Sequence, residues 1–256
     1  MSPLAWGLVA SLLLNLLIFP IAYRLQTDKL TDVTYCLSFL GLVMYGMIVG
    51  DVASSLSKVM VSALIIIWAF RLGAYLYRRV SILGKDDRFD EIRVSPRRFL
   101  RFFVLQGFSA WVIALPFLYL LLSQELESEV HMVTAAGLVV AIVGLILETV
   151  ADHQKSAFKN QPGNRNRFYD GGLYSWIRYP NYLGEMLFWI GIFIMSIPVL
   201  SGWRWLAVLS PIIIILLLLF VSGVPFIEKS RDKKYGDDPD YQQYISDTSI
   251  ILPGVY

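Results

Sequence analysis

Long runs of apolar residues, separated by short polar segments, dominate this sequence. A helix needs about 20 mostly apolar residues to cross the hydrocarbon core of a bilayer. Seven runs approach that length, at residues 4–23, 32–50, 59–77, 100–122, 132–150, 182–200 and 205–224. No stretch alternates apolar and polar residues over about ten positions, so the pattern excludes a membrane β-barrel. The sequence therefore predicts an all-α, polytopic membrane bundle of about seven transmembrane helices.

The composition agrees with this class, because 56% of the 256 residues are hydrophobic and only 16% are charged. The first run follows no charged segment and precedes no small-residue cleavage site, so we interpret it as a retained helix. Cys36 is the sole cysteine, and His131 and His153 are the only histidines. These residues give neither a disulfide nor a metal-site spacing. We expect a single membrane domain over residues 1–256 that holds no metal.

Basic residues are distributed unevenly among the loops. If seven helices cross the membrane, alternate loops lie on opposite sides of it. The loops of one side carry most of the basic residues: Arg24, Lys29, Arg78, Arg79, Lys85, Arg88, Arg93, Arg97, Arg98, Lys155, Lys159, Arg165, Arg167, Arg178, Lys229, Arg231, Lys233 and Lys234. The other side has Lys58, Arg204 and the acidic patch of Glu125, Glu127 and Glu129. The positive-inside rule therefore predicts an external N-terminus and a cytoplasmic C-terminus.

The segment 148–185 differs in chemistry from the apolar runs on both sides of it. Spacing of i, i+4 puts Glu148 and Asp152 on one helix face, and Asn181 and Glu185 on another. The arginines between them suit phosphate oxygens, which a guanidinium binds bidentately. A nucleotide site is one interpretation, and a structural ion pair of Glu185 with Arg71 or Arg178 is the other. No GxGxxG or Walker motif is present, which excludes a Rossmann or P-loop site.

Several short motifs follow one another along the chain. They are E-x-x-x-D-x-Q at 148–154, N-R-N-R-F at 164–168, G-G-L-Y at 171–174 and R-Y-P-N-Y-L-G-E at 178–185. R-L-G-x-Y-L at 71–76, G-K-D-x-R at 84–88 and G-V-P-x-x-E-K at 223–229 complete the set. Together they resemble the steroid 5α-reductase C-terminal family, specifically its bacterial-type branch, DUF1295. That branch usually has a histidine where this chain has Tyr179.

The resemblance implies a membrane-embedded oxidoreductase that uses NADPH to reduce a lipophilic α,β-unsaturated carbonyl compound, steroid-like or lipid-like. The helices of about 4–122 would serve the substrate, and residues of about 132–256 would bind the cofactor on the cytoplasmic side of a bacterial inner membrane. The family's cofactor contacts carry over to Asp152, Arg167, Asn181, Glu185, Glu148, Asn164, Arg178, Lys85, Arg88 and Tyr244. The expected partners are this substrate and membrane lipids, without nucleic acid; the sequence leaves the oligomeric state unknown.

Reduction of an enone also needs a protein acid at the carbonyl oxygen, because enolate charge develops there in the transition state. The tyrosine that has this role in the steroid-reducing branch falls at Trp68 of this chain. The nearest hydroxyls are those of Tyr35 and Tyr45, which we take as the candidate proton donors.

Two other functions stay open at this point. Membrane methyltransferases of the isoprenylcysteine and phospholipid type share an R-H-P-x-Y-x-G element and bind S-adenosylmethionine. They usually carry paired glutamates after the last helix, where this chain has Glu228 and Lys229. A non-enzymatic transporter or scaffold is the third alternative, although a transporter should place polar groups near the bilayer midplane.

Overall fold

The computed structural model describes residues 2–27, 29–83, 90–124 and 130–252. Over these residues the chain is helical, apart from turns and an isolated bridge between Ile177 and Ser249. Seven helical stretches in this part of the chain are long and apolar enough to cross a membrane: Pro3–Arg24, Lys29–Val49, Leu56–Arg78, Pro96–Leu122, Met132–Lys159, Pro180–Val199 and Gly202–Tyr235. The predicted class, an all-α integral membrane protein, is confirmed.

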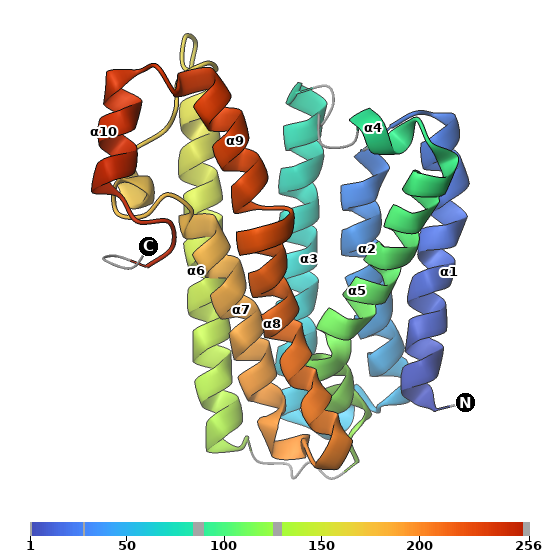
Figure 1. Ribbon diagram of the computed structural model, residues 1–256. Helices are drawn as coiled ribbons and strands as arrows, with labels where there is room; N and C mark the ends of the chain where they lie inside the picture. The colour runs from blue at the N-terminus through green and yellow to red at the C-terminus, as the bar shows by residue number, and fades with distance from the viewer. Residues whose placement is uncertain (1, 28, 84–89, 125–129, 253–256) are drawn as a thin grey trace. The chain divides into compact units, whose positions relative to one another are not determined.

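The chain forms two compact units. Unit 1 comprises Met1–Leu138 and Ile192–Pro211, and unit 2 comprises Val139–Gly191 and Ile212–Tyr256. The helices of the first half, all in unit 1, are α1 (Pro3–Arg24), α2 (Lys29–Val49), α3 (Leu56–Leu83), α4 (Asp90–Arg93) and α5 (Pro96–Leu122). Both α1 and α2 pack against α5 (Figure 1), which is the most buried of the seven spans.

A buried polar seam joins α1, α2 and α5. The side-chain amide of Asn15, which is fully buried, donates hydrogen bonds to the carbonyl of Ser11 and to Oγ of Ser38, both at 2.9 Å. Ser11 in turn donates to the carbonyl of Gly107 at 2.8 Å. Inside a membrane these groups have no water to bond, so the donors of Asn15 and Ser11 bond to neighbouring oxygens.

The second half of the chain contributes α6 (Met132–Lys159), α7 (Pro180–Ser196), α8 (Leu209–Leu216), α9 (Val224–Tyr235) and α10 (Pro239–Asp247). The sequence predicts the last membrane run as one segment, at 205–224. In the structure it consists of a 3-10 segment at Gly202–Val208, then α8, then a π-helical segment at Leu217–Val221. Gly223 separates this segment from α9, which has a proline in its first turn.

The tail of the chain forms a short helix, α10, with one buried face. The side chain of Asp238, the residue before α10, caps the first turn by accepting a hydrogen bond from the amide of Asp240 at 3.0 Å. Tyr241 and Tyr244 form its buried face, and they pack on the ring of Phe168 with centroid distances of 5.3 and 5.7 Å.

Within unit 2, α6 and α7 pack backbone to backbone (Figure 1). A Cβ atom at Gly144 would lie 2.4 Å from the amide nitrogen of Phe188, and one at Gly191 would lie 2.3 Å from that of Ala141. Small residues at a contact between membrane helices permit this close approach. The contact fixes the register of the two helices and therefore the positions of the polar residues at their ends.

Candidate functional site

The carboxylates of α6 meet the beginning of α7. A Cβ atom at Gly184 would lie 2.5 Å from the amide nitrogen of Glu148, so these two positions face each other across the helix contact. The helices are antiparallel, because residues 141, 144 and 148 of α6 contact residues 191, 188 and 184 of α7, in that order. The next turn of α6 therefore brings Asp152 level with Pro180 and Asn181. Four of the predicted cofactor contacts thus belong to one end of this helix pair: Glu148, Asp152, Asn181 and Glu185.

Two of these side chains are removed from bulk water. Glu148 is 3% exposed and Asp152 is 4% exposed. Glu185 is half-buried and accepts a hydrogen bond from the indole of Trp189 at 3.3 Å. Asn181 accepts one from the hydroxyl of Tyr174 at 3.5 Å. A buried carboxylate is costly unless it is hydrogen-bonded or paired, so such groups commonly mark functional sites in membrane proteins.

The loop between α6 and α7 is held against α6 by Gln154. Its side-chain oxygen accepts a hydrogen bond from the amide of Leu173 at 3.0 Å. Gly172 has a φ of 57°, and a Cβ atom there would lie 2.5 Å from this same oxygen. Only glycine can adopt this backbone conformation and lie so close to the oxygen of Gln154. This explains the second glycine of the G-G-L-Y motif.

The earlier part of this loop presents basic groups to solvent. Arg167 is exposed, and its Nη1 donates to the side-chain oxygen of Asn164 at 3.4 Å. Lys159 at the end of α6 donates to the carbonyls of Arg165, at 3.2 Å, and Arg167. The loop is therefore shaped by its own backbone contacts, and the guanidinium of Arg167 lies at the surface. Lys85 and Arg88, also predicted as cofactor contacts, lie outside the described residues.

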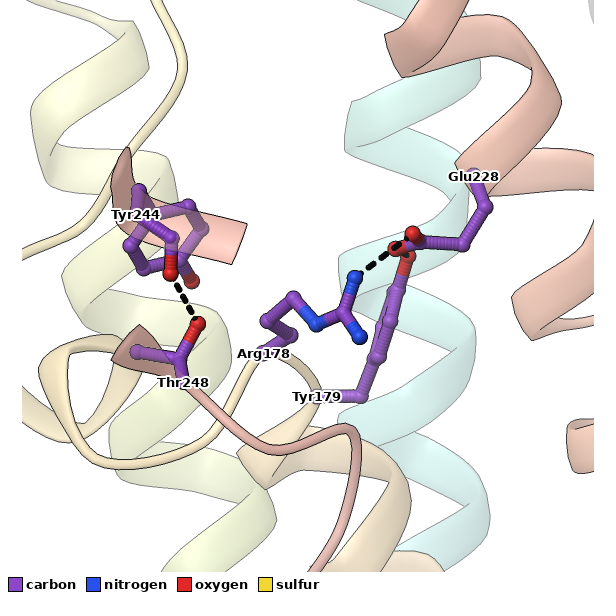
Figure 2. Close-up of polar contacts among 5 residues, drawn as sticks. All are labelled: Arg178, Tyr179, Glu228, Tyr244 and Thr248. Carbon is purple, nitrogen blue, oxygen red and sulfur yellow. Dashed lines mark hydrogen bonds and ion pairs between the residues drawn. The ribbon is translucent and has the colours of Figure 1, made fainter. Parts of the chain in front are cut away.

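A second polar cluster forms around Glu228 of α9, which the sequence did not single out as a site residue. Its Oε2 lies 2.7 Å from Nη1 of Arg178, and its Oε1 accepts a hydrogen bond from the hydroxyl of Tyr179. Figure 2 shows both side chains reaching this carboxylate from the turn before α7. The guanidinium carbon of Arg231 lies 5.2 Å from the ring centroid of Tyr179. From the sequence, Arg178 was predicted to pair with Glu185 or to contact the cofactor. In the structure, Arg178 forms an ion pair with Glu228.

Two tyrosines near this cluster are held in the neutral form. Burial raises the pKa of Tyr179 far above its usual range, and burial raises the pKa of Tyr244 to about 12. The hydroxyl of Tyr244 donates to the carbonyl of Tyr174 at 3.0 Å, and Thr248 donates to the carbonyl of Tyr244 at 2.6 Å (Figure 2). Both tyrosines are thus hydrogen-bond donors over the physiological pH range.

The two candidate proton donors lie in unit 1, at different depths of α2. Tyr35 is half-buried and packs its ring on Phe39 and Trp68, with centroid distances of 5.0 and 6.3 Å. The hydroxyl of Tyr45 donates to the carbonyl of Pro3 at 2.7 Å. Ten residues of helix separate the two tyrosines by about 15 Å along the axis. A single carbonyl oxygen can therefore use one of them and not both.

These features define a polytopic helical membrane protein with a polar cluster at one end of a helix pair. Among the residues that the structure describes, no group of three or more His, Cys, Asp or Glu side chains is placed to hold a metal ion. The family described as "Protein of unknown function (DUF1295)" matches residues 18–248. The chain belongs to this family.

A relative found by sequence comparison is described as "Probable O-methyltransferase ustE", from Ustilaginoidea virens. It is 34% identical to this chain over 68 residues. The matched region covers 27% of this chain and 24% of the relative, so the likeness is confined to about a quarter of each protein. No solved structure matches the chain.

Proposed function

We propose that this protein is a membrane-embedded, NADPH-dependent reductase of a lipophilic α,β-unsaturated carbonyl compound. The observation that carries the proposal is the placement of Glu148, Asp152, Asn181 and Glu185 at one end of the antiparallel pair α6 and α7. These are the positions at which the motifs resemble the steroid 5α-reductase C-terminal family. Their assembly supports a binding role, since residues kept only to mark topology need no common location.

The residues fit the chemical groups of the proposed cofactor. Buried carboxylates such as those of Glu148 and Asp152 accept hydrogen bonds from ribose hydroxyls or from a carboxamide. The side-chain amide of Asn181 can both donate and accept. The exposed guanidinium of Arg167 suits a phosphate, which it can bind bidentately. A nucleotide with sugar, amide and phosphate groups is matched by this set of residues.

NADPH, when bound, supplies a hydride for the β-carbon of an enone. The chain's own tasks are to orient the nucleotide through Asp152 and Asn181, to keep water away through burial, and to polarise the substrate's carbonyl oxygen. Positioned donors lower the energy of the developing enolate, and they act more strongly where water is scarce. For the donor we retain Tyr35 and Tyr45 as the candidates; the hydroxyl of Tyr45 donates to the carbonyl of Pro3.

A methyltransferase that uses S-adenosylmethionine is the second candidate. One observation favours it, namely the partial likeness to a protein described as a probable O-methyltransferase. Either candidate would make this protein a membrane enzyme, and the two differ in the cofactor that they bind. The identity of the bound cofactor is therefore the property to determine first.

The test is ligand-dependent thermal unfolding of the purified protein in detergent. A ligand that binds only the folded state stabilises it by about 2.7 kcal/mol at a concentration of 100 times its Kd. We expect NADPH to raise the Tm and S-adenosylmethionine to leave it unchanged. Asp152→Asn and Glu185→Gln should reduce the shift, whereas Asp247→Asn, an exposed aspartate in α10, should preserve it.

Stabilisation by S-adenosylmethionine alone would exclude the reductase and support the methyltransferase. A full NADPH response in either site variant would remove that residue from the assignment. With NADPH binding established, oxidation of NADPH in the presence of a panel of lipophilic enones identifies the substrate class.

A further inference from the structure

An apolar groove of about 450 Å³ runs along unit 2 between α7 and the last membrane span. Leu183, Leu187 and Ile190 form its wall on α7, Ile215 and Leu219 form the opposite wall, and Ile250 closes it from the C-terminal segment. Every side chain that lines it is apolar. Its volume lies within the roughly 300–1,000 Å³ that small-molecule pockets occupy.

The groove lies on a different face of α7 from the proposed nucleotide contacts. Leu183, Leu187 and Ile190 are spaced i, i+4 and i+7, so they form a single stripe along the helix. Asn181 and Glu185 are two residues before Leu183 and Leu187, and two residues of helix turn by about 200°. The groove is therefore a separate feature from the site proposed for the nucleotide.

The wall opposite α7 departs from regular helix. Leu217–Val221 forms a π-helical turn, and Leu219 and Phe220 within it line the groove. π-Helical turns are rare, and where they do occur they are frequently part of a functional site. Here the π-helical turn widens the helix at the residues that line the groove.

One end of the groove borders the polar cluster on α9. Val224 lines the groove, and Glu228 and Arg231 follow at one and two turns along α9. The Nη1 atom of Arg231 is buried and has no hydrogen-bond partner among the residues that the structure describes. A buried cationic donor favours an anionic acceptor. The same helix carries the exposed basic residues Lys229, Lys233 and Lys234.

We propose that this groove binds an acyl chain of an anionic phospholipid, with the lipid phosphate held by Arg231. The groove belongs to two membrane-crossing segments, so the bilayer itself supplies the chain. The guanidinium matches the phosphate geometrically, and basic residues beside a membrane span attract anionic lipids in preference to zwitterionic ones. The site lies outside the proposed reductase chemistry and is independent of which cofactor the protein binds.

The test is native mass spectrometry of the purified protein with phosphatidylglycerol or with phosphatidylcholine of the same acyl chains. We expect the wild-type protein to retain phosphatidylglycerol about tenfold more tightly than phosphatidylcholine. Arg231→Gln should remove this preference. Leu187→Trp should fill the groove and prevent retention of either lipid, while Leu216→Trp, at a position that is 47% exposed and outside the groove, should retain both.

Equal retention of the two lipids by the wild-type protein would overturn the assignment of the headgroup, and this comparison needs no variant. Equal loss of retention in Leu187→Trp and Leu216→Trp would overturn the assignment of the groove. Circular dichroism reports whether each variant is folded, and Leu219→Trp fills the same groove from the other wall if Leu187→Trp does not fold.

Discussion

Arg178 and Glu228 form an ion pair at 2.7 Å although they lie fifty residues apart in the chain. Tyr179 donates a hydrogen bond to the second oxygen of the same carboxylate. The amides of Arg178 and Tyr179 also donate to the carbonyls of Ser249 and Ile250, at 2.9 and 3.2 Å. The turn before α7 is thus joined to α9 by its side chains and to the C-terminal segment by its backbone.

The first prediction concerns this ion pair. Arg178→Gln and Glu228→Gln should each destabilise unit 2, because each leaves a partly buried charge without its partner. A double-mutant cycle should give a coupling energy of about 0.5–3 kcal/mol. Unfolding in mixed detergent micelles measures it. Gln243→Ala, which removes an exposed hydrogen bond to Asp247, serves as the control; additive effects of the two glutamine substitutions would contradict the prediction.

The second prediction concerns the contact between α6 and α7. Gly184→Ala should cost about 1–3 kcal/mol, because the added methyl group would overlap the backbone of Glu148 and force the helices apart. The same change at Gly41 of α2, where nothing lies within 4 Å of the new Cβ atom, should be neutral or stabilising. Thermal unfolding compares the two variants. A similar Tm for both would show that the helices can shift without cost.

The third prediction concerns alkaline pH. Burial raises the pKa of Tyr244 from 10.0 to about 12 in the folded protein, so its contribution to stability is complete below pH 10 and is lost as the pH rises to 12. Tyr244→Phe has no hydroxyl to ionise. The wild-type protein should therefore lose stability more steeply than the variant over this interval, as measured by Tm against pH. Parallel curves would show that Tyr244 does not contribute to the alkaline loss.

The fourth prediction concerns the polar seam of unit 1. Asn15→Ala removes the hydrogen bonds to Ser11 and Ser38 and should destabilise the protein by about 1–2 kcal/mol. Leu17→Ala, at a position of the same helix that is 70% exposed, is the control and should have a smaller effect. Unfolding in mixed micelles distinguishes them. An equal effect of the two substitutions would mean that the seam adds nothing beyond ordinary packing.

The fifth prediction concerns orientation in the membrane. Cys36 is buried and is the only cysteine, so Cys36→Ala gives a background free of thiols. On that background, Pro162→Cys should react with an impermeant maleimide only after the membrane is opened, and Trp203→Cys should react in intact cells. The distribution of basic residues gives this expectation. The reverse pattern would invert the predicted topology.

Much of the fold follows from local patterns. The seven apolar runs predicted the seven spans, because length and hydropathy alone decide whether a helix can cross a membrane. The start of α10 also depends on adjacent residues, since Asp238 caps its first turn and Pro239 is its first residue. The interruption of the last span was not predicted, because its apolar residues give no periodic signal that separates α-helix from π-helix.

The candidate site was predicted in part. Motif spacing grouped Glu148 with Asp152, and Asn181 with Glu185, since each pair lies within one helix. Glu228 was missed as a partner of Arg178 and Tyr179, because only folding brings α9 to the turn before α7. The only signal for Glu228 in the sequence was its position in the G-V-P-x-x-E-K motif, which does not indicate what Glu228 contacts.

The sequence by itself determined the class of this protein, the number of its spans and the residues in which its polar chemistry is concentrated. Those properties depend on composition and on spacing within one helix. The tertiary structure decided which of the polar residues meet. The approach of Gly184 to Glu148 sets the register of α6 and α7, and the shared carboxylate of Glu228 joins α9 to Arg178 and Tyr179. Such pairings depend on packing between segments far apart in the chain, which no local pattern specifies.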